Sequence, residues 1–198
     1  MTLERLRPLA DRALAPFVAI ADRYGVTPDA VSVLAFLLAV GAGLSFYVGG
    51  QWYLLGAVLV FANGWLDLLD GRLARVQGSA SPAGDVLDHV LDRYADVVVI
   101  AGLAAGVGRY GLGFAAVTGV LLTSYLGTQA EAVGLDRVYA GLLGRADRLA
   151  LVGVAAVLQL PVGAVGSLTP VGWLLVLFAV VGHLTAVQRF FAVRRGLR

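Results

Sequence analysis

Six segments of the chain are each apolar over about 20 residues, the length of helix that crosses the hydrocarbon core of a lipid bilayer. These segments cover residues 30–49, 52–72, 86–108, 111–132, 148–166 and 170–191. Charged residues make up only 14 % of the sequence, whereas a soluble domain averages about 25 %. The sequence therefore predicts an all-α integral membrane protein with six transmembrane helices.

Short glycine-containing breaks separate the apolar segments, so we expect neighbouring helices to be antiparallel. Residues 1–25 precede the first segment and carry leucines at helical spacing, including Leu3 and Leu6, with arginines between them. This pattern is typical of an amphipathic helix at the membrane surface, and a frayed polar leader is the alternative. We expect one domain over residues 1–198, in which a juxtamembrane helix (1–25) leads into a six-helix bundle (26–198).

The charged residues are distributed unequally between the two sides of the predicted bundle. Six spans place both termini on one side, and 14 of the 15 arginines lie at or near that side, with Arg109 on the other. All 13 acidic residues also lie toward it. Because basic residues accumulate on the cytoplasmic side of membranes, we expect a multi-pass protein of the cell membrane whose termini and active site are cytoplasmic.

Six aspartates lie within 30 residues, at the ends of the second and third apolar segments: Asp67, Asp70, Asp85, Asp88, Asp92 and Asp96. A lone carboxylate at membrane depth costs at least about 2.5 kcal/mol, so this cluster requires compensating cations. Spacings of three and four residues place the acids on one face of each helix, and the two faces can meet across the turn. Such an oxygen-rich site favours Mg²⁺, Mn²⁺ or Ca²⁺ over zinc, with room for two ions.

Two other interpretations of the acidic cluster are surface salt bridges between helix ends and a pathway for metal-ion transport. The neighbouring Arg72, Arg75 and Arg93 supply partners for salt bridges. A transporter predicts acids in several spans and through the depth of the bilayer, whereas these acids gather at one end. A non-catalytic scaffold leaves the two acidic faces without a purpose.

The acidic stretch resembles the signature of the CDP-alcohol phosphotransferase family. Its spacing reads Asp67-x2-Asp70-Gly71-x2-Ala74-Arg75-x8-Gly84-x3-Asp88-x3-Asp92, and all eight fixed positions of the signature are matched. The preceding Thr27-Pro28-Asp29 resembles the family's Thr-Pro-Asn, with aspartate in place of asparagine. The resemblance implies an enzyme of phospholipid biosynthesis that moves a phospho-alcohol group from a CDP-lipid to an acceptor alcohol and releases CMP.

The resemblance also implies a role for each residue of the signature. The ligands of Mg²⁺ or Mn²⁺, expected as two ions, would be Asp67, Asp70, Asp88 and Asp92. Asp92 would also be the catalytic base that deprotonates the acceptor. The CDP-binding residues would be Gly71, Ala74, Arg75 and Gly84. Because members of the family are usually homodimers, the expected partners are the membrane, the two substrates and a second copy of the chain, with no nucleic acid.

The stretch after the fourth apolar segment resembles the inositol-phosphate branch of this family. The branch has an Ala-Glu pair, matched by Ala130-Glu131, and a later Arg-x2-Arg-Leu, matched by residues 145–149. The resemblance implies inositol 1-phosphate as acceptor, with glycerol 3-phosphate as the alternative, and CDP-archaeol or CDP-diacylglycerol as donor. Arg145 and Arg148 would bind the acceptor phosphate together, with help from Arg137. Ordinary positive-inside topology is the other interpretation of these arginines.

Overall fold

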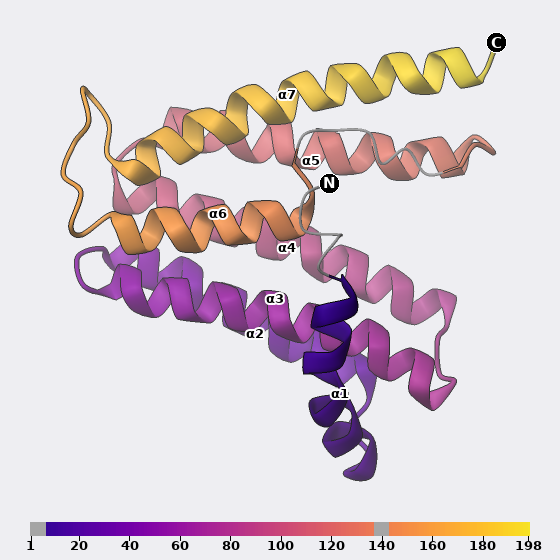
Figure 1. Cartoon of the computed structure of the whole chain (residues 1–198). Helices are drawn as coiled ribbons and strands as arrows, with labels where there is room; N and C mark the ends of the chain where they lie inside the picture. The colour runs from indigo at the N-terminus through magenta and orange to yellow at the C-terminus, as the bar shows by residue number, and fades with distance from the viewer. Residues whose placement is uncertain (1–6, 137–142) are drawn as a thin grey trace.

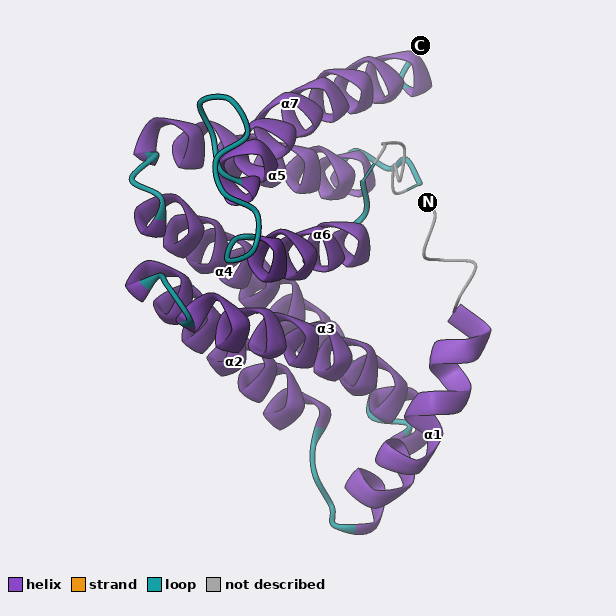
Figure 2. Cartoon of the chain, turned by 60° about the vertical axis from the view of Figure 1, so that its left-hand side comes forward, coloured by secondary structure: helices purple, strands orange, loops and turns teal. Residues whose placement is uncertain are grey.

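The computed structural model describes residues 7–136 and 143–198, and all the regular secondary structure in these two ranges is helical (Figure 1). The helices are α1 (Arg7–Arg23), α2 (Pro28–Val48), α3 (Trp52–Gln77), α4 (Pro82–Gly106), α5 (Tyr110–Ala132), α6 (Arg145–Leu158) and α7 (Pro170–Gly196). A helix therefore occupies each of the six predicted apolar segments. Helices α2 to α7 run side by side as a bundle, and α1 lies across one end of it (Figures 1 and 2).

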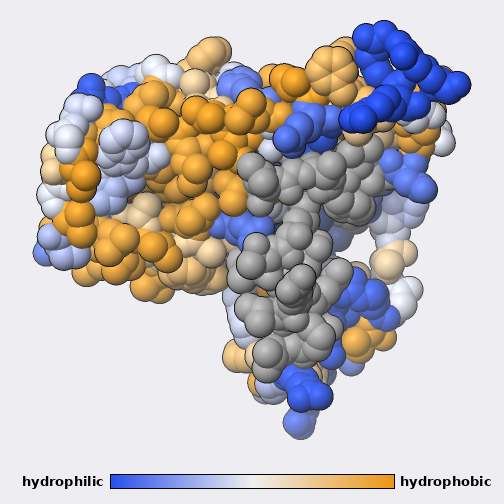
Figure 3. Space-filling model, turned by 45° about the horizontal axis from the view of Figure 1, so that its top comes forward, coloured by the Kyte–Doolittle hydropathy of each residue, from blue (hydrophilic) through white to orange (hydrophobic). Residues whose placement is uncertain are grey.

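Four helices within the described residues are long and apolar enough to cross a membrane, namely α2, α3, α5 and α7. Helix α4 has 25 residues, but its first 15 residues carry five charged side chains. Helix α6 has only 14 residues, which span about 21 Å of a hydrocarbon core roughly 30 Å thick. Figure 3 shows a continuous apolar surface over the bundle, with hydrophilic side chains gathered around the C-terminal end of α7.

Helix α6 is shorter at its C-terminal end than the predicted 148–166 and begins three residues earlier. It begins early because the carboxylate of Asp147 accepts a hydrogen bond of 2.9 Å from the backbone N–H of Gly144. It ends early because the following residues include Pro161 and form a tight turn in which the N–H of Val165 donates to the carbonyl of Leu168 at 2.8 Å. Proline removes the N–H that a helix requires, so the apolar run continues as a loop.

Three helices begin with the same local device, a hydroxyl residue followed by proline. The side chains of Thr27, Ser81 and Thr169 each accept a hydrogen bond from a backbone N–H in the first turn of α2, α4 and α7. The hydroxyl satisfies a donor that the helix leaves free, and proline at the first position needs none. The first two of these helix starts lie at the end of the bundle that holds the acidic cluster.

Helices α2 and α4 approach each other closely because glycine faces glycine. A Cβ atom on Gly102 of α4 would collide with the backbone carbonyl of Gly43 of α2. Small residues of this kind allow helix backbones to pack tightly where water provides no hydrophobic driving force. The contact fixes α4, which carries half of the acidic cluster, against α2.

Helix α1 uses its apolar face to pack on α3. Leu14 and Val18 of α1 are buried in one cluster with Leu69 and Leu73 of α3. The rings of Phe17 and Trp65 add an edge-to-face contact, with 5.7 Å between centroids. The predicted amphipathic helix is therefore present over the described residues, and its apolar stripe covers the turns of α3 that carry the first acids of the signature.

Candidate functional site

The site lies where the end of α3 meets the beginning of α4. The turn between these helices starts at Gly78, whose φ of +61° is the left-handed conformation that glycine adopts without strain. Its N–H lies over the last carbonyls of α3 and closes that helix. The chain reverses within four residues and enters α4 at Pro82. The acids at the end of α3 are thereby brought beside the acids at the start of α4.

Three carboxylates of the signature converge on one point. One oxygen from each of Asp67, Asp88 and Asp92 lies within 4.8 Å of the other two. All three residues are partly buried. Like charges at this separation repel strongly unless a cation lies between them. The spacing is therefore that of a cation site, and Asp67 and Asp92 contribute from two different helices.

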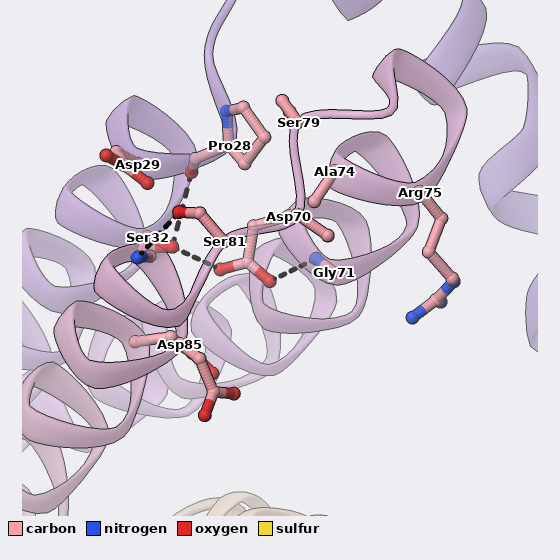
Figure 4. Close-up of a pocket in the computed structure, with 13 residues that line it drawn as sticks. Pro28, Asp29, Ser32, Asp70, Gly71, Ala74, Arg75, Ser79, Ser81 and Asp85 are labelled. Atoms are coloured by element: carbon pink, nitrogen blue, oxygen red, sulfur yellow. Dashed lines mark hydrogen bonds between the residues drawn. The ribbon is translucent and has the colours of Figure 1, made fainter.

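Asp70 lies beside these three carboxylates but has its own hydrogen-bond partners. Its Oδ2 accepts a hydrogen bond of 2.7 Å from the hydroxyl of Ser32 on α2, and its Oδ1 faces the N–H of Gly71 (Figure 4). The side chain is buried, with 5 % of its surface exposed. Ser32 thus fixes the orientation of an acid that lies 38 residues later in the chain.

Arg145, at the first turn of α6, extends into the carboxylate cluster. Its Nη2 lies 2.6 Å from Oδ1 of Asp92, and its Nη1 contacts Oδ1 of Asp67. Helix α6 packs against α3, which brings this arginine to the acids although it lies more than 50 residues after them. The guanidinium supplies the positive charge that bridges two of the three converging carboxylates.

A second set of ion pairs lies one turn deeper in the bundle. Asp96 on α4 pairs with Arg148 on α6 at 3.1 Å and with Arg93 at 3.5 Å. Arg93 also lies 3.5 Å from Asp92 and donates to the hydroxyl of Ser124 on α5. Arg148 is buried, with 9 % of its surface exposed. These pairs hold α4, α5 and α6 together behind the converging carboxylates.

A cavity of about 200 Å³, open to solvent on one side, adjoins the cluster (Figure 4). The four residues predicted to bind CDP all line it: Gly71, Ala74, Arg75 and Gly84. A Cβ atom on Gly84 would lie 3.3 Å from Oδ1 of Asp29, so a side chain there would crowd this wall of the cavity. Asp70 and Asp88 line both this cavity and the small space between the carboxylates.

The remaining predicted residues fall in different places. Arg145 and Arg148 do not form a pair apart from the acids, because each is engaged by carboxylates of α3 or α4. Arg137 lies outside the described residues. Asp85 is at the rim of the cavity, with an exposed side chain that lies 3.4 Å from Nδ1 of His89.

Sequence reasoning missed two polar residues that shape the site. One is Ser32, the partner of Asp70. The other is Asn63, whose side-chain N–H donates to the carbonyl of Ala35 at 2.9 Å and which lies one turn below Asp67. Both are buried. Neither carries a motif, although a buried polar residue within an apolar segment is itself a signal of a polar partner.

The donor set fits a divalent metal of the hard class. Three carboxylates within 4.8 Å of one another, with a fourth adjoining them, provide the oxygen ligands that Mg²⁺ and Mn²⁺ prefer. The guanidinium of Arg145 among these oxygens is a further sign that the cluster requires a cation. Asp67, Asp88 and Asp92 are the residues able to hold the ion, with Asp70 beside them.

Together these features define the class of protein: a helical membrane protein with a carboxylate-lined cavity at one end of its bundle. Residues 25–184 match the family model described as CDP-alcohol phosphatidyltransferase. The chain belongs to this family of enzymes. The match covers α2 to α6, the signature and most of α7.

Several named relatives match almost the whole chain. An archaetidylinositol phosphate synthase of Methanothermobacter thermautotrophicus is 30 % identical over 99 % of this chain and 96 % of its own length. A phosphatidylinositol phosphate synthase of Streptomyces avermitilis is 33 % identical over 96 % of this chain and 81 % of its own length.

The fold matches a solved membrane enzyme. The crystal structure of the phosphatidylinositol phosphate synthase of Mycobacterium tuberculosis with CDP-DAG bound superposes with a TM-score of 0.78 at 28 % identity, over 92 % of this chain and 94 % of that one. The same enzyme in complex with manganese and citrate also gives a TM-score of 0.78, over 91 % and 88 % of the two chains. This chain is therefore a multi-pass membrane protein with the fold of that enzyme.

Proposed function

We propose that this enzyme transfers the phospho-alcohol group of a CDP-lipid to inositol 1-phosphate and releases CMP. The observation that carries the proposal is the shared wall between two features. The cavity lined by the signature residues Gly71, Ala74, Arg75 and Gly84 borders the converging carboxylates through Asp70 and Asp88. A nucleotide diphosphate in that cavity would thus have its phosphates beside the cation site.

Asp67, Asp88 and Asp92 are proposed to hold Mg²⁺ or Mn²⁺, with Asp70 completing a site for two ions. When bound, such ions neutralise the charge of the diphosphate and make CMP a better leaving group. Ser32 keeps Asp70 turned toward the site. Gly71 and Ala74 leave space for the nucleotide, and Arg75 is available to its phosphates as a planar donor.

Asp92 is the proposed general base. Its carboxylate takes the proton of the acceptor hydroxyl, whose oxygen forms a bond to the lipid-side phosphorus while the bond from that phosphorus to CMP breaks. The electron pair leaves with CMP, and no covalent intermediate with the enzyme is required. Arg93 and Arg145 contact Asp92 and orient its carboxylate.

The acceptor is proposed from the named relatives and from the arginines of α6. Both relatives described above are inositol phosphate lipid synthases by name. Arg145, in the first turn of α6, contacts the carboxylates and is the proposed phosphate-binding residue, with Arg137 as a second contact. Arg148, the other arginine predicted to bind this phosphate, is paired with Asp96. Glycerol 3-phosphate is the alternative acceptor, and the donor is CDP-archaeol or CDP-diacylglycerol.

We also propose that the single domain has six transmembrane crossings, with α4 and the α6 segment as the third and fifth. Three charged side chains of α4 contact other helices: Asp92 and Asp96 pair with arginines of α6, and Arg93 donates to Ser124 of α5. These contacts lower the cost of placing this helix in lipid. The arginine distribution supports termini and a site on the cytoplasmic side. A homodimer is proposed because members of the family are usually homodimers.

Purified enzyme in detergent tests the function by release of CMP from CDP-diacylglycerol and CDP-archaeol. We expect turnover with Mn²⁺ and inositol 1-phosphate, none in excess EDTA, and none in Asp88→Asn, because one of the three converging ligands is lost. Asp22→Asn, on the exposed face of α1, is the matched control and should retain activity. Preference for free inositol or serine would refute the acceptor, and full turnover in EDTA would refute the metal.

A further inference from the structure

The guanidinium of Arg145 lies between Asp67 and Asp92, against oxygens that a metal bound by these two residues could also contact. Its guanidinium contacts an oxygen of each, and its side chain has only 15 % of its surface exposed. The converging carboxylates and the arginine are therefore one ion cluster. A divalent ion that bound the same oxygens, Oδ1 of Asp67 and Oδ1 of Asp92, would compete with the guanidinium for them.

The contact of Arg145 with Asp67 and Asp92 neutralises charge but leaves part of the guanidinium without well-aligned hydrogen bonds. Within the described residues, Nε and Nη1 of Arg145 are buried without a hydrogen bond of good geometry. A structural arginine normally places its donors in bidentate, well-aligned bonds. Here Nη1 contacts Asp67 outside that geometry, and Nε has no acceptor among the described residues. Loss of the arginine alone would leave buried, unpaired acids, whereas another cation in its place would keep them neutralised.

We propose that Arg145 is the displaceable counter-ion of this cluster: it neutralises Asp67 and Asp92 in the metal-free enzyme and withdraws when a divalent cation binds them. The proposal rests on the metal site proposed above and adds a competitor for it. Arg145 is the first residue of α6, after Gly144, so its side chain can turn outward without unwinding the helix.

Two consequences follow from this competition. The apparent affinity for metal is lowered by the fraction of enzyme in which Arg145 holds the carboxylates. In addition, the guanidinium becomes available to an anionic substrate only after it has left the acids. Binding of a phosphorylated acceptor at Arg145 would then follow metal binding, and the two events would be thermodynamically coupled.

Calorimetric titration of metal-free enzyme with Mn²⁺ tests the competition directly. We expect Arg145→Gln to bind Mn²⁺ about tenfold more tightly than the wild type, because the competing state is removed. The matched control is Arg148→Gln, which removes a buried arginine of the same helix that pairs with Asp96 and not with the three converging acids. A general effect of lost positive charge would tighten binding in both variants, whereas displacement tightens it in the first alone.

Thermal unfolding of the same proteins separates displacement from a structural role. Metal-free Arg145→Gln should melt below the metal-free wild type, since its buried acids have lost their cation, and the difference should shrink in saturating Mn²⁺. Arg148→Gln should melt below the wild type to the same extent with or without Mn²⁺, because its partner Asp96 lies outside the metal site.

A measurement on the wild type avoids any variant that fails to fold. Modification by phenylglyoxal, followed by mass spectrometry, should spare Arg145 in EDTA and label it in Mn²⁺, with exposed Arg198 labelled in both. Equal protection of Arg145 with and without Mn²⁺, or an unchanged Mn²⁺ affinity in Arg145→Gln, overturns the displacement while leaving the proposed function intact. Absence of Mn²⁺ binding to the wild type overturns the metal site and the displacement together.

Discussion

At Asp92, contacts from three helices meet on one side chain. Two carboxylates, Asp67 and Asp88, lie within 4.8 Å, and the guanidinium groups of Arg93 and Arg145 lie 3.5 and 2.6 Å away. The acids repel one another, and the two arginines offset part of that repulsion. A residue in such surroundings is suited both to bind a cation and to accept a proton, which are the two roles proposed for it.

Gly84 offers a direct test of the donor cavity at the residue scale. Gly84→Leu should raise the KM for CDP-lipid at least about tenfold, because a side chain there enters the cavity beside Asp29, and a lost binding contribution of about 1.4 kcal/mol is a factor of ten. Steady-state kinetics with varied CDP-lipid measures this. Gly111→Leu is the control, because a Cβ atom there meets nothing within 4 Å. An unchanged KM in Gly84→Leu would mean that the nucleotide binds elsewhere.

At the scale of the helices, the site depends on how closely α2, α3 and α4 pack. Ser32 of α2 reaches Asp70 of α3, and Gly43 of α2 meets Gly102 of α4. A buried ion pair then connects α4 to α6, and a hydrogen bond from Arg93 to Ser124 connects α4 to α5. Four of the carboxylates, Asp67, Asp70, Asp92 and Asp96, each contact a helix other than their own. Tight helix packing is therefore a requirement of the site as well as of stability.

Gly102→Ala should destabilise the enzyme although alanine is the better helix former. The added Cβ atom collides with the carbonyl of Gly43, and overpacking of this kind costs about 1–3 kcal/mol. Thermal unfolding in detergent should show a lower Tm, by roughly 2–4 °C for each kcal/mol at this chain length. The control Gly111→Ala should be neutral or stabilising, and an equal Tm for both variants would show that the α2–α4 contact is not tight.

At the scale of the whole molecule, the candidate site and the apolar surface suited to lipid lie in different parts of the bundle. The acids, their arginine partners and the cavity lie at one end of the bundle, and apolar side chains cover much of its surface (Figure 3). A lipid substrate can therefore keep its tails beside the apolar helices while its polar head lies in the cavity. This arrangement fits transfer between a membrane-bound donor and a water-soluble acceptor.

The proposed orientation is testable because the chain contains no cysteine. Single variants Arg198→Cys and Ser167→Cys place exposed thiols at opposite ends of the proposed topology. A membrane-impermeant maleimide applied to intact cells should label Ser167→Cys and should label Arg198→Cys only after permeabilisation. The reverse pattern would place the site outside the cytoplasm, and labelling of both in intact cells would rule out their separation by the membrane.

The sequence by itself determined the local features of this protein. Apolar length and turn residues predicted helices in all six segments, and the spacing of Asp67, Asp70, Asp88 and Asp92 predicted a carboxylate cluster, because helix periodicity and short turns are local properties of the chain. The length of α6 was predicted less well, since the residues around Pro161 remain apolar although they cannot continue the helix.

Only the tertiary structure decided which residues from distant segments meet. No spacing connects Ser32 to Asp70, Asp96 to Arg148, or Arg145 to the carboxylates of α3 and α4. These contacts depend on the rotation of each helix about its axis and on the partners that its neighbours present, and both are set by packing across the bundle. For this reason the sequence predicted arginines standing apart from the acids, whereas the fold places Arg145 among them.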